Sequence, residues 1–125
     1  MVKKLILISS GLIDQKYASS SFDLLPDEGD EVQLNMDIYR TVWDEASRLR
    51  GSGHLLEIVQ RITCPIVAIH GDYDPHPANG IKHPLSQAIK DFRFVLLKKC
   101  GHYPWRERNA RDTFYRILNA EIRQQ

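Results

Sequence analysis

The chain has 125 residues, of which 42% are hydrophobic and 26% are charged. These proportions are ordinary for a soluble globular protein, and the length is enough for one compact core. The 17 lysines and arginines nearly balance the 16 aspartates and glutamates, which argues against a general affinity for nucleic acid or for an anionic membrane surface. We therefore expect a single domain that has neither nucleic acid nor membrane as a partner.

The N-terminal sequence MVKKLILISSG resembles the start of a secretory signal, but its apolar run at 5–8 is too short and no small-residue cleavage site follows. No stretch approaches the length of a transmembrane helix. Cys64 and Cys100 form no CxxC motif, so free thiols in a reducing compartment are the expectation. These features predict a cytoplasmic protein.

Apolar runs alternate with segments of helical spacing along the chain. LILI at 5–8 and IVAI at 66–69 are continuous, as strands covered on both faces of a parallel sheet are, and FRFVLL at 92–97 is a third strand. Apolar residues at intervals of three or four predict helices over about 35–50 and 55–62, separated by a Gly-Ser-Gly break, and a C-terminal helix over about 106–122.

This order predicts an α/β fold, with a three-stranded parallel sheet, flanking helices, right-handed crossovers and a helical cap insertion. Residues 1–11 would hold the first strand, residues 12–62 the cap-like insertion, and residues 63–125 the other two strands and the C-terminal helix. Within the insertion, the polar residues 14–34 are expected to form a loop or a lid.

The stretch HGDYDPHP at 70–77 places two histidines and two aspartates directly after the second strand. A metal site is disfavoured, because Gly71, Pro75 and Pro77 are unsuited to a regular strand of alternating ligands. An EF-hand loop would need glycine where Pro77 stands. We therefore expect no metal and no cofactor. A plain turn remains an alternative, since Asp and Pro are common turn formers.

A second polar stretch, KKCGHYPWRER at 98–108, follows the third strand in the same way. Asp74 and His102 each come just past the carboxyl end of a predicted strand, and active sites of open α/β sheets assemble at that edge. We predict that the two side chains lie within hydrogen-bonding distance. The carboxylate would then fix the imidazole tautomer and stabilise the imidazolium that forms when histidine takes a proton.

The sequence PIVAIHGDYDP, followed later by CGHYPWRE, resembles the C-terminal half of an α/β-hydrolase. By this resemblance Asp74 is the acid of a Ser-His-Asp triad and His102 is its base. VKKLILISSG resembles the strand after the nucleophile, and residues 12–62 resemble the helical cap. The resemblance implies a serine hydrolase that acts on an ester, an amide or a similar small substrate.

The nucleophile of such a triad is missing from the sequence. α/β-Hydrolases carry it on a GxSxG elbow, and no such motif occurs here. Ser9 and Ser10 in LISSG are the nearest candidates, but Leu7 stands where the elbow of Ser9 needs a small residue. Ser52 lies between two predicted helices, and Cys100 is only two residues from His102, so neither suits the role. We therefore expect a C-terminal portion of a hydrolase that is inactive alone.

Asp72 is expected to be a turn-capping carboxylate, with support of the acid loop or substitution for Asp74 as the alternatives. The other polar and aromatic side chains receive non-catalytic predictions: packing at the strand end for His70, exposure for His76 and His83, aromatic packing for Trp43 and Trp105 (or a pocket lining for Trp105), and pairing with an arginine for Glu107.

Two functional hypotheses remain open at this point. The first is the acid- and base-bearing part of a hydrolase, which binds a small substrate once an N-terminal half completes it. The second is a non-catalytic module, derived from a hydrolase, that binds a partner or self-associates. Under both, the first strand exposes an unpaired edge, which predicts a homodimer or a partner chain through that strand.

Overall fold

The computed structural model describes residues 1–13, 16 and 35–124, so nearly all of the loop predicted at 14–34 lies outside the described residues. In chain order the elements are β1 (Leu5–Ile8), α1 (Met36–Gly51), α2 (His54–Val59), β2 (Ile66–Gly71), α3 (Asn79–Ala88), β3 (Phe92–Leu97) and α4 (Arg111–Arg123). No helix in this part of the chain is long and apolar enough to cross a membrane.

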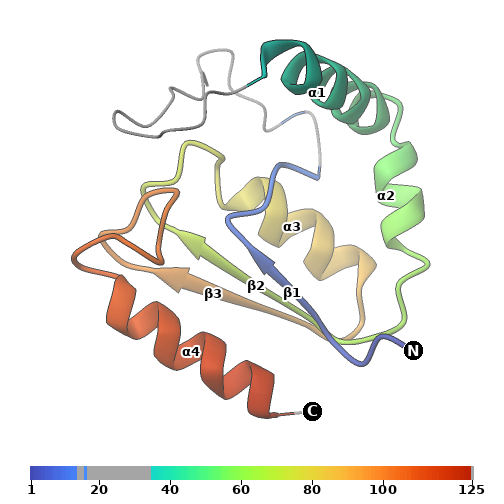
Figure 1. Cartoon of the computed structure of the whole chain (residues 1–125). Helices are drawn as coiled ribbons and strands as arrows, with labels where there is room; N and C mark the ends of the chain where they lie inside the picture. The colour runs from blue at the N-terminus through green and yellow to red at the C-terminus, as the bar shows by residue number, and fades with distance from the viewer. Residues whose placement is uncertain (14–15, 17–34, 125) are drawn as a thin grey trace.

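The three strands form one parallel sheet in the order β1-β2-β3, as predicted (Figure 1). β2 is central and every one of its residues is buried, whereas all four residues of β1 are only partly buried. Ile66 and Ala68 face a cluster built with α2 and α3, and Val67 and Ile69 face a second cluster built with α4. Helices therefore cover both faces of the sheet, which explains the continuous apolar sequence of β2.

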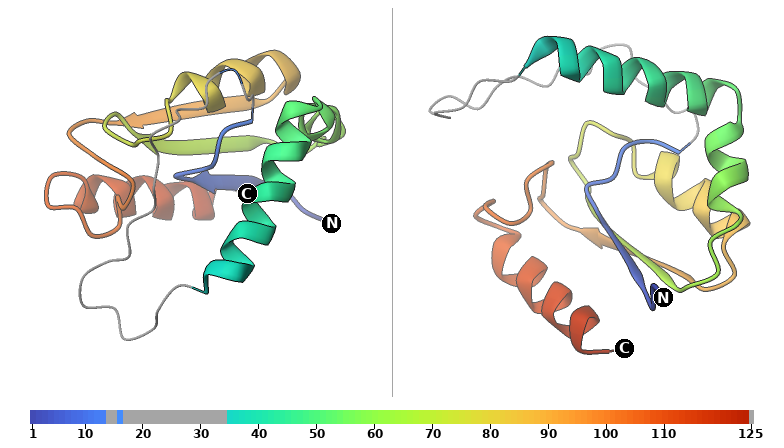
Figure 2. Two further views of the ribbon diagram at one scale, coloured as in Figure 1. Left: turned by 90° about the horizontal axis from the view of Figure 1, so that it is seen from above. Right: turned by 45° about the vertical axis from the view of Figure 1, so that its right-hand side comes forward.

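The helix α1 stands apart from this layered body, beyond the carboxyl ends of the strands (Figures 1 and 2). Asn35 begins it by accepting hydrogen bonds from the amides of Asp37 and Ile38. None of its residues is buried. Trp43 packs near the segment after β1, since a Cβ added to Gly11 would lie 3.8 Å from its ring. This position agrees with the aromatic packing predicted for Trp43.

The helix α4 begins at Arg111, five residues later than predicted. The apolar stripe correctly marks the helix, but residues 103–110 form turns in which the amide of Arg106 bonds to Tyr103 and that of Ala110 bonds to Glu107. A stripe of apolar residues defines the buried face of a helix better than it defines its first turn.

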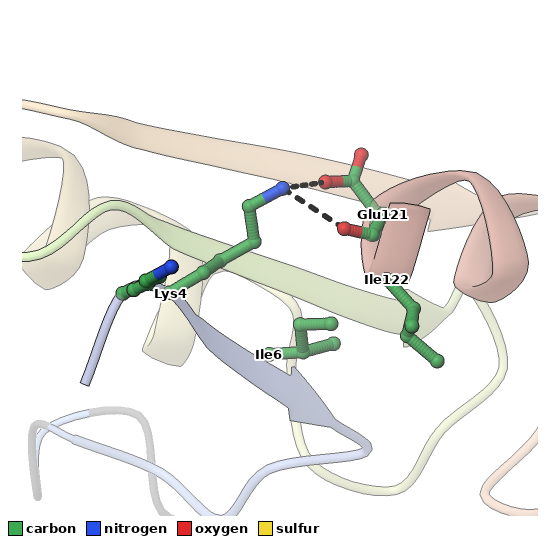
Figure 3. A pocket seen from close by; sticks show the side chains of 5 residues that line it. Lys4, Ile6, Glu121 and Ile122 are labelled. Atoms are coloured by element: carbon green, nitrogen blue, oxygen red, sulfur yellow. Dashed lines mark hydrogen bonds and ion pairs between the residues drawn. The ribbon is translucent and has the colours of Figure 1, made fainter. Parts of the chain in front are cut away.

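One buried carboxylate fastens α4 across the sheet. Glu121 is only 3% exposed. It accepts a hydrogen bond from Lys4 at 3.1 Å (Figure 3) and another from Arg93 of β3. Burial alone would raise the pKa of Glu121, but these two cations outweigh it and lower that pKa. Next to this contact lies a hollow of about 320 Å³ between the start of β1 and the C-terminal part of α4, lined by Lys3, Lys4, Ile6, Glu121 and Ile122.

Candidate active site

Two loops meet at the carboxyl edge of the sheet, one after β2 and one after β3 (Figure 1). The first carries Asp74 and the second carries His102. The Nδ1 atom of His102 lies 2.9 Å from Oδ2 of Asp74, so the contact predicted from the sequence is present. It arises because neighbouring parallel strands end at the same edge, which brings residues 28 positions apart into hydrogen-bonding distance.

The two loops are joined through their backbones. The amide of Tyr73 donates to the carbonyl of Cys100 at 2.8 Å, and the amide of Cys100 donates to Oδ1 of Asp72 at 3.0 Å. This second bond lowers the pKa of the Asp72 carboxyl group. Among the roles predicted for Asp72, this contact favours support of the acid loop. Substitution for Asp74 stays a prediction.

Glu107 orders the backbone on both sides of His102. Its Oε1 accepts from the amide of Gly101 at 2.7 Å, and its Oε2 accepts from the amide of Tyr103 at 2.8 Å. The predicted pairing of Glu107 with an arginine is absent among the described residues, because backbone amides engage both oxygens. Glu107 instead fixes the loop that presents the imidazole.

The second oxygen of Asp74 is held by His76. Its Oδ1 accepts from the His76 amide at 2.8 Å and from the His76 ring Nδ1 at 3.0 Å. The exposure predicted for His76 is wrong, since this residue is only 8% exposed. An aspartate often bonds to the amide two residues onward, and here that turn draws the imidazole inward. His83 is exposed, as predicted.

His70 stabilises the turn of residues 74–76 through a hydrogen bond to its backbone. It is buried at the end of β2, as predicted, and its Nε2 donates to the carbonyl of His76 at 2.8 Å. This carbonyl can only accept, so the Nε2 atom of His70 carries the proton. His70 thus holds the backbone of His76 in place without taking either oxygen of Asp74, from which its Nε2 lies 3.9 Å away.

Asp74 is ionised at neutral pH. Burial by itself would raise the pKa of this carboxyl group, but the hydrogen bonds from the His76 side chain and backbone and from His102 together lower the pKa to about 2. An ionised carboxylate only accepts hydrogen bonds, so the Nδ1 atoms of His76 and His102 both carry protons that face it. In this tautomer the Nε2 atom of a neutral His102 is the basic nitrogen.

The low pKa makes the stability of the fold depend on pH. The folded pKa of Asp74 lies below its ordinary value of 3.8, so its stabilisation is present above about pH 4 and is lost as pH falls toward 2. We expect Asp74→Asn to lower the free energy of unfolding by about 2 kcal/mol at pH 7 and by much less at pH 2.5. Urea denaturation at both pH values measures this.

The control for this prediction is Asp112→Asn, which removes an exposed carboxylate of α4. It should leave the free energy of unfolding nearly unchanged at both pH values. A loss of stability in Asp74→Asn that is equal at pH 7 and pH 2.5 would contradict the ionised carboxylate.

No described residue is an activated nucleophile. Ser9 has a left-handed φ of 48°, which is uncommon for a residue other than glycine, but its buried Oγ has no hydrogen-bond partner among the described residues. Ser10 donates its hydroxyl to the carbonyl of Gly11. Cys100 is fully buried, and burial raises the pKa of its thiol to about 11, so its reactive thiolate is not formed at neutral pH.

Aromatic rings border His102 on the side of the second loop. Its ring meets the ring of Tyr103 edge to face at a centroid distance of 5.1 Å, and Tyr103 meets Trp105 at 5.6 Å. Arg106 lies over the Tyr103 ring. Trp105 is 39% exposed, which makes it a packing aromatic at the surface. Its alternative role in lining a substrate pocket stays a prediction.

Comparisons with known proteins place this geometry in a fold. No family model matches the chain, and no curated protein is found to be similar to it. Among solved structures, the α/β-hydrolase monoacylglycerol lipase of Paleococcus ferrophilus aligns with a TM-score of 0.60 at 16% sequence identity. The alignment covers 94% of this chain and 57% of the lipase chain, so the chain spans little more than half of the lipase. At this identity the likeness concerns the fold, and it confirms the predicted one: the chain has a partial α/β-hydrolase-like fold.

Proposed function

We propose that Asp74 and His102 are the acid and the base of a Ser-His-Asp relay that hydrolyses an ester, an amide or a similar small substrate. The observation that carries this proposal is the 2.9 Å contact between an ionised, buried carboxylate and an imidazole at the carboxyl edge of the sheet. In such a relay the carboxylate orients the imidazole, and Nε2 takes the proton of the nucleophile. Asp72 and Glu107 act as positioning residues, because they order the two loops.

The relay needs a nucleophile from a segment that bears a GxSxG elbow, a motif that the 125 residues do not contain. The outer side of β1 is a suitable place for a partner strand. The amide of Leu5 donates to the carbonyl of Pro65, just before β2, and the amide of Ser9 donates to the carbonyl of Ile69 of β2. In an extended strand the amides of Ile6 and Ile8 therefore face the other way. Among the described residues, β1 pairs with β2 alone. The partner is an elbow-bearing segment or a second copy of this chain.

The catalytic proposal is tested by supplying the elbow. A GxSxG-bearing N-terminal half of an α/β-hydrolase is fused to residues 1–125 or expressed with them, and the labelling rate of its serine by a fluorophosphonate is measured. We expect labelling that falls by about 10⁴-fold in His102→Asn, because the base is lost. The matched control His83→Asn changes an exposed histidine of α3 and should label at the full rate.

Residues 1–125 alone provide the baseline of the same experiment. They should show neither fluorophosphonate labelling nor turnover of p-nitrophenyl acetate above that of His102→Asn, because none of the residues that the structure describes is an activated nucleophile. Stoichiometric labelling of Ser9 or Ser10 would place the nucleophile on this chain and overturn that part of the proposal. Labelling of the fused serine at the same rate in His102→Asn would overturn the role of His102.

A further inference from the structure

The proposed relay uses one imidazole, but two imidazoles face the carboxylate of Asp74. Nδ1 of His76 lies 3.0 Å from Oδ1, and Nδ1 of His102 lies 2.9 Å from Oδ2. The side chain of Asp74 is fully buried, while those of His76 and His102 are 10% and 20% exposed. The hydrolytic proposal leaves His76 without a chemical role, although its ring is drawn inward to the same carboxylate.

We propose that Asp74, His76 and His102 form a binding site for a divalent transition-metal ion, with Zn²⁺ as the ion that fits best. One carboxylate and two imidazoles are ligands that Zn²⁺ commonly takes, and three protein ligands leave further positions for water. Imidazole nitrogens favour such ions over Mg²⁺ and Ca²⁺, which prefer oxygen ligands. The proposal rests on this side-chain cluster and is independent of the hydrolytic function.

The spacing of the atoms is close to that of a coordination shell. One ligand atom from each of the three residues lies within 4.8 Å of the others. Ligands that each lie about 2.0–2.2 Å from a zinc ion are separated from one another by about 3.0–3.6 Å. The two nitrogen–oxygen distances of 2.9 and 3.0 Å are already near that range. Small rotations of the two rings, whose centroids are 5.4 Å apart, would complete the approach.

The other polar residues of the 70–77 stretch are engaged elsewhere. His70 donates its Nε2 proton to the carbonyl of His76, and Asp72 accepts from the amide of Cys100. The four alternating residues 70, 72, 74 and 76 therefore do not form the metal site, in agreement with the sequence analysis, which disfavours a strand of alternating metal ligands here. The third ligand comes from the neighbouring loop. His70 becomes an outer partner that steadies the backbone of a ligand, as many metal sites require.

Metal binding and general-base catalysis would exclude each other. For a neutral imidazole, coordination through Nδ1 requires that its proton leave Nδ1 and reappear on Nε2, by exchange with solvent and with no net change in protons. Protonated Nε2 of His102 can no longer accept a proton from a nucleophile. The bound ion also replaces the hydrogen bonds of both imidazoles to Asp74. With the ion bound, Asp74 and His102 therefore cannot act as the acid and the base of the proposed relay.

The site is tested by titrating Zn²⁺ into residues 1–125 and measuring the heat of binding by isothermal titration calorimetry. We expect one ion per chain, with an association constant that falls about 10–100-fold in His76→Asn and in His102→Asn, at least the loss seen when an outer-shell partner is removed. Asparagine places an amide donor near the position of Nδ1, so the hydrogen bond to Asp74 can persist while the imidazole ligand is lost. The matched control His83→Asn should bind as tightly as the unchanged chain.

Nitrogen NMR of the unchanged chain keeps the test decisive if a variant fails to fold. Added Zn²⁺ should shift the Nδ1 resonances of His76 and His102 and convert both rings to the Nε2-protonated tautomer, with His54 and His83 unaffected. Equal zinc affinity in His76→Asn, or shifts confined to His54 and His83, would overturn the site. The hydrolytic proposal would survive that outcome, because its own test uses fluorophosphonate labelling without added metal.

Discussion

Gly71→Ala is expected to abolish folding or to lower the free energy of unfolding by more than about 4 kcal/mol, a size reserved for severe steric or charge defects. A Cβ at this position would lie 2.7 Å from the carbonyl carbon of Cys100 and closer still to the carbonyl oxygens of Cys100 and Gly101. These are backbone atoms, so no side-chain rotation relieves the overlap. Gly71 ends β2 where the two site loops come into contact.

The backbone cannot move aside without cost. Displacing residues 100 and 101 would break the bonds that join the loops, from Tyr73 to Cys100 and from Cys100 to Asp72. It would also separate the amide of Gly101 from Glu107. The effect of a single methyl group therefore reaches the contact between Asp74 and His102, and any folded fraction should lose it.

Gly51→Ala is the matched control, because a Cβ there meets no atom within 4 Å. Gly51 is the last residue of α1, and alanine favours a helix over glycine by up to about 1 kcal/mol. Thermal unfolding followed by circular dichroism compares both variants with the unchanged chain. If Gly71→Ala loses no more stability than Gly51→Ala, the close approach of the two loops at Gly71 is wrong.

The sequence predicts the layers of this fold well because the strands are marked by what they bury. Residues 66–69 are all apolar, which is typical of a strand that is covered on both faces of the sheet. The contact between Asp74 and His102 follows from the same pattern, since two parallel neighbours must end at one edge. The first turn of α4 did not follow, because residues 103–110 bond to one another in turns that an apolar stripe does not specify.

The environment of the site was harder to predict because it depends on loop backbone. His76 stands between two prolines in a polar stretch, a pattern that predicts an exposed side chain. Instead, hydrogen bonds from its amide and its ring to Asp74 hold the imidazole in a buried position. The available signal was the spacing of an aspartate two residues before the amide that it can accept from. Glu107 gave no comparable signal, because its two amide partners are defined only by the path of the loop around His102.

We expect residues 1–125 alone to form a dimer through the outer edge of β1 at micromolar concentration, with twice the 14.5 kDa mass of the chain. A two-fold axis through that edge pairs the two β1 strands antiparallel and extends the sheet from one protomer into the other. All four β1 residues are only partly buried. Ile122, which is 51% exposed, and Ile6 line the hollow beside this edge (Figure 3), so pairing would also cover apolar surface.

Ile6→Pro separates pairing from folding. Proline removes the amide donor at position 6, which faces away from β2, whereas the amides of Leu5 and Ser9 still bond toward β2. We expect this variant to sediment as a folded monomer, with circular dichroism confirming its helices. The matched variant Ile6→Val keeps the donor and a branched side chain, so it should remain a dimer. A monomeric unchanged chain, or an Ile6→Pro variant that still dimerises, would show that the edge of β1 is not the interface.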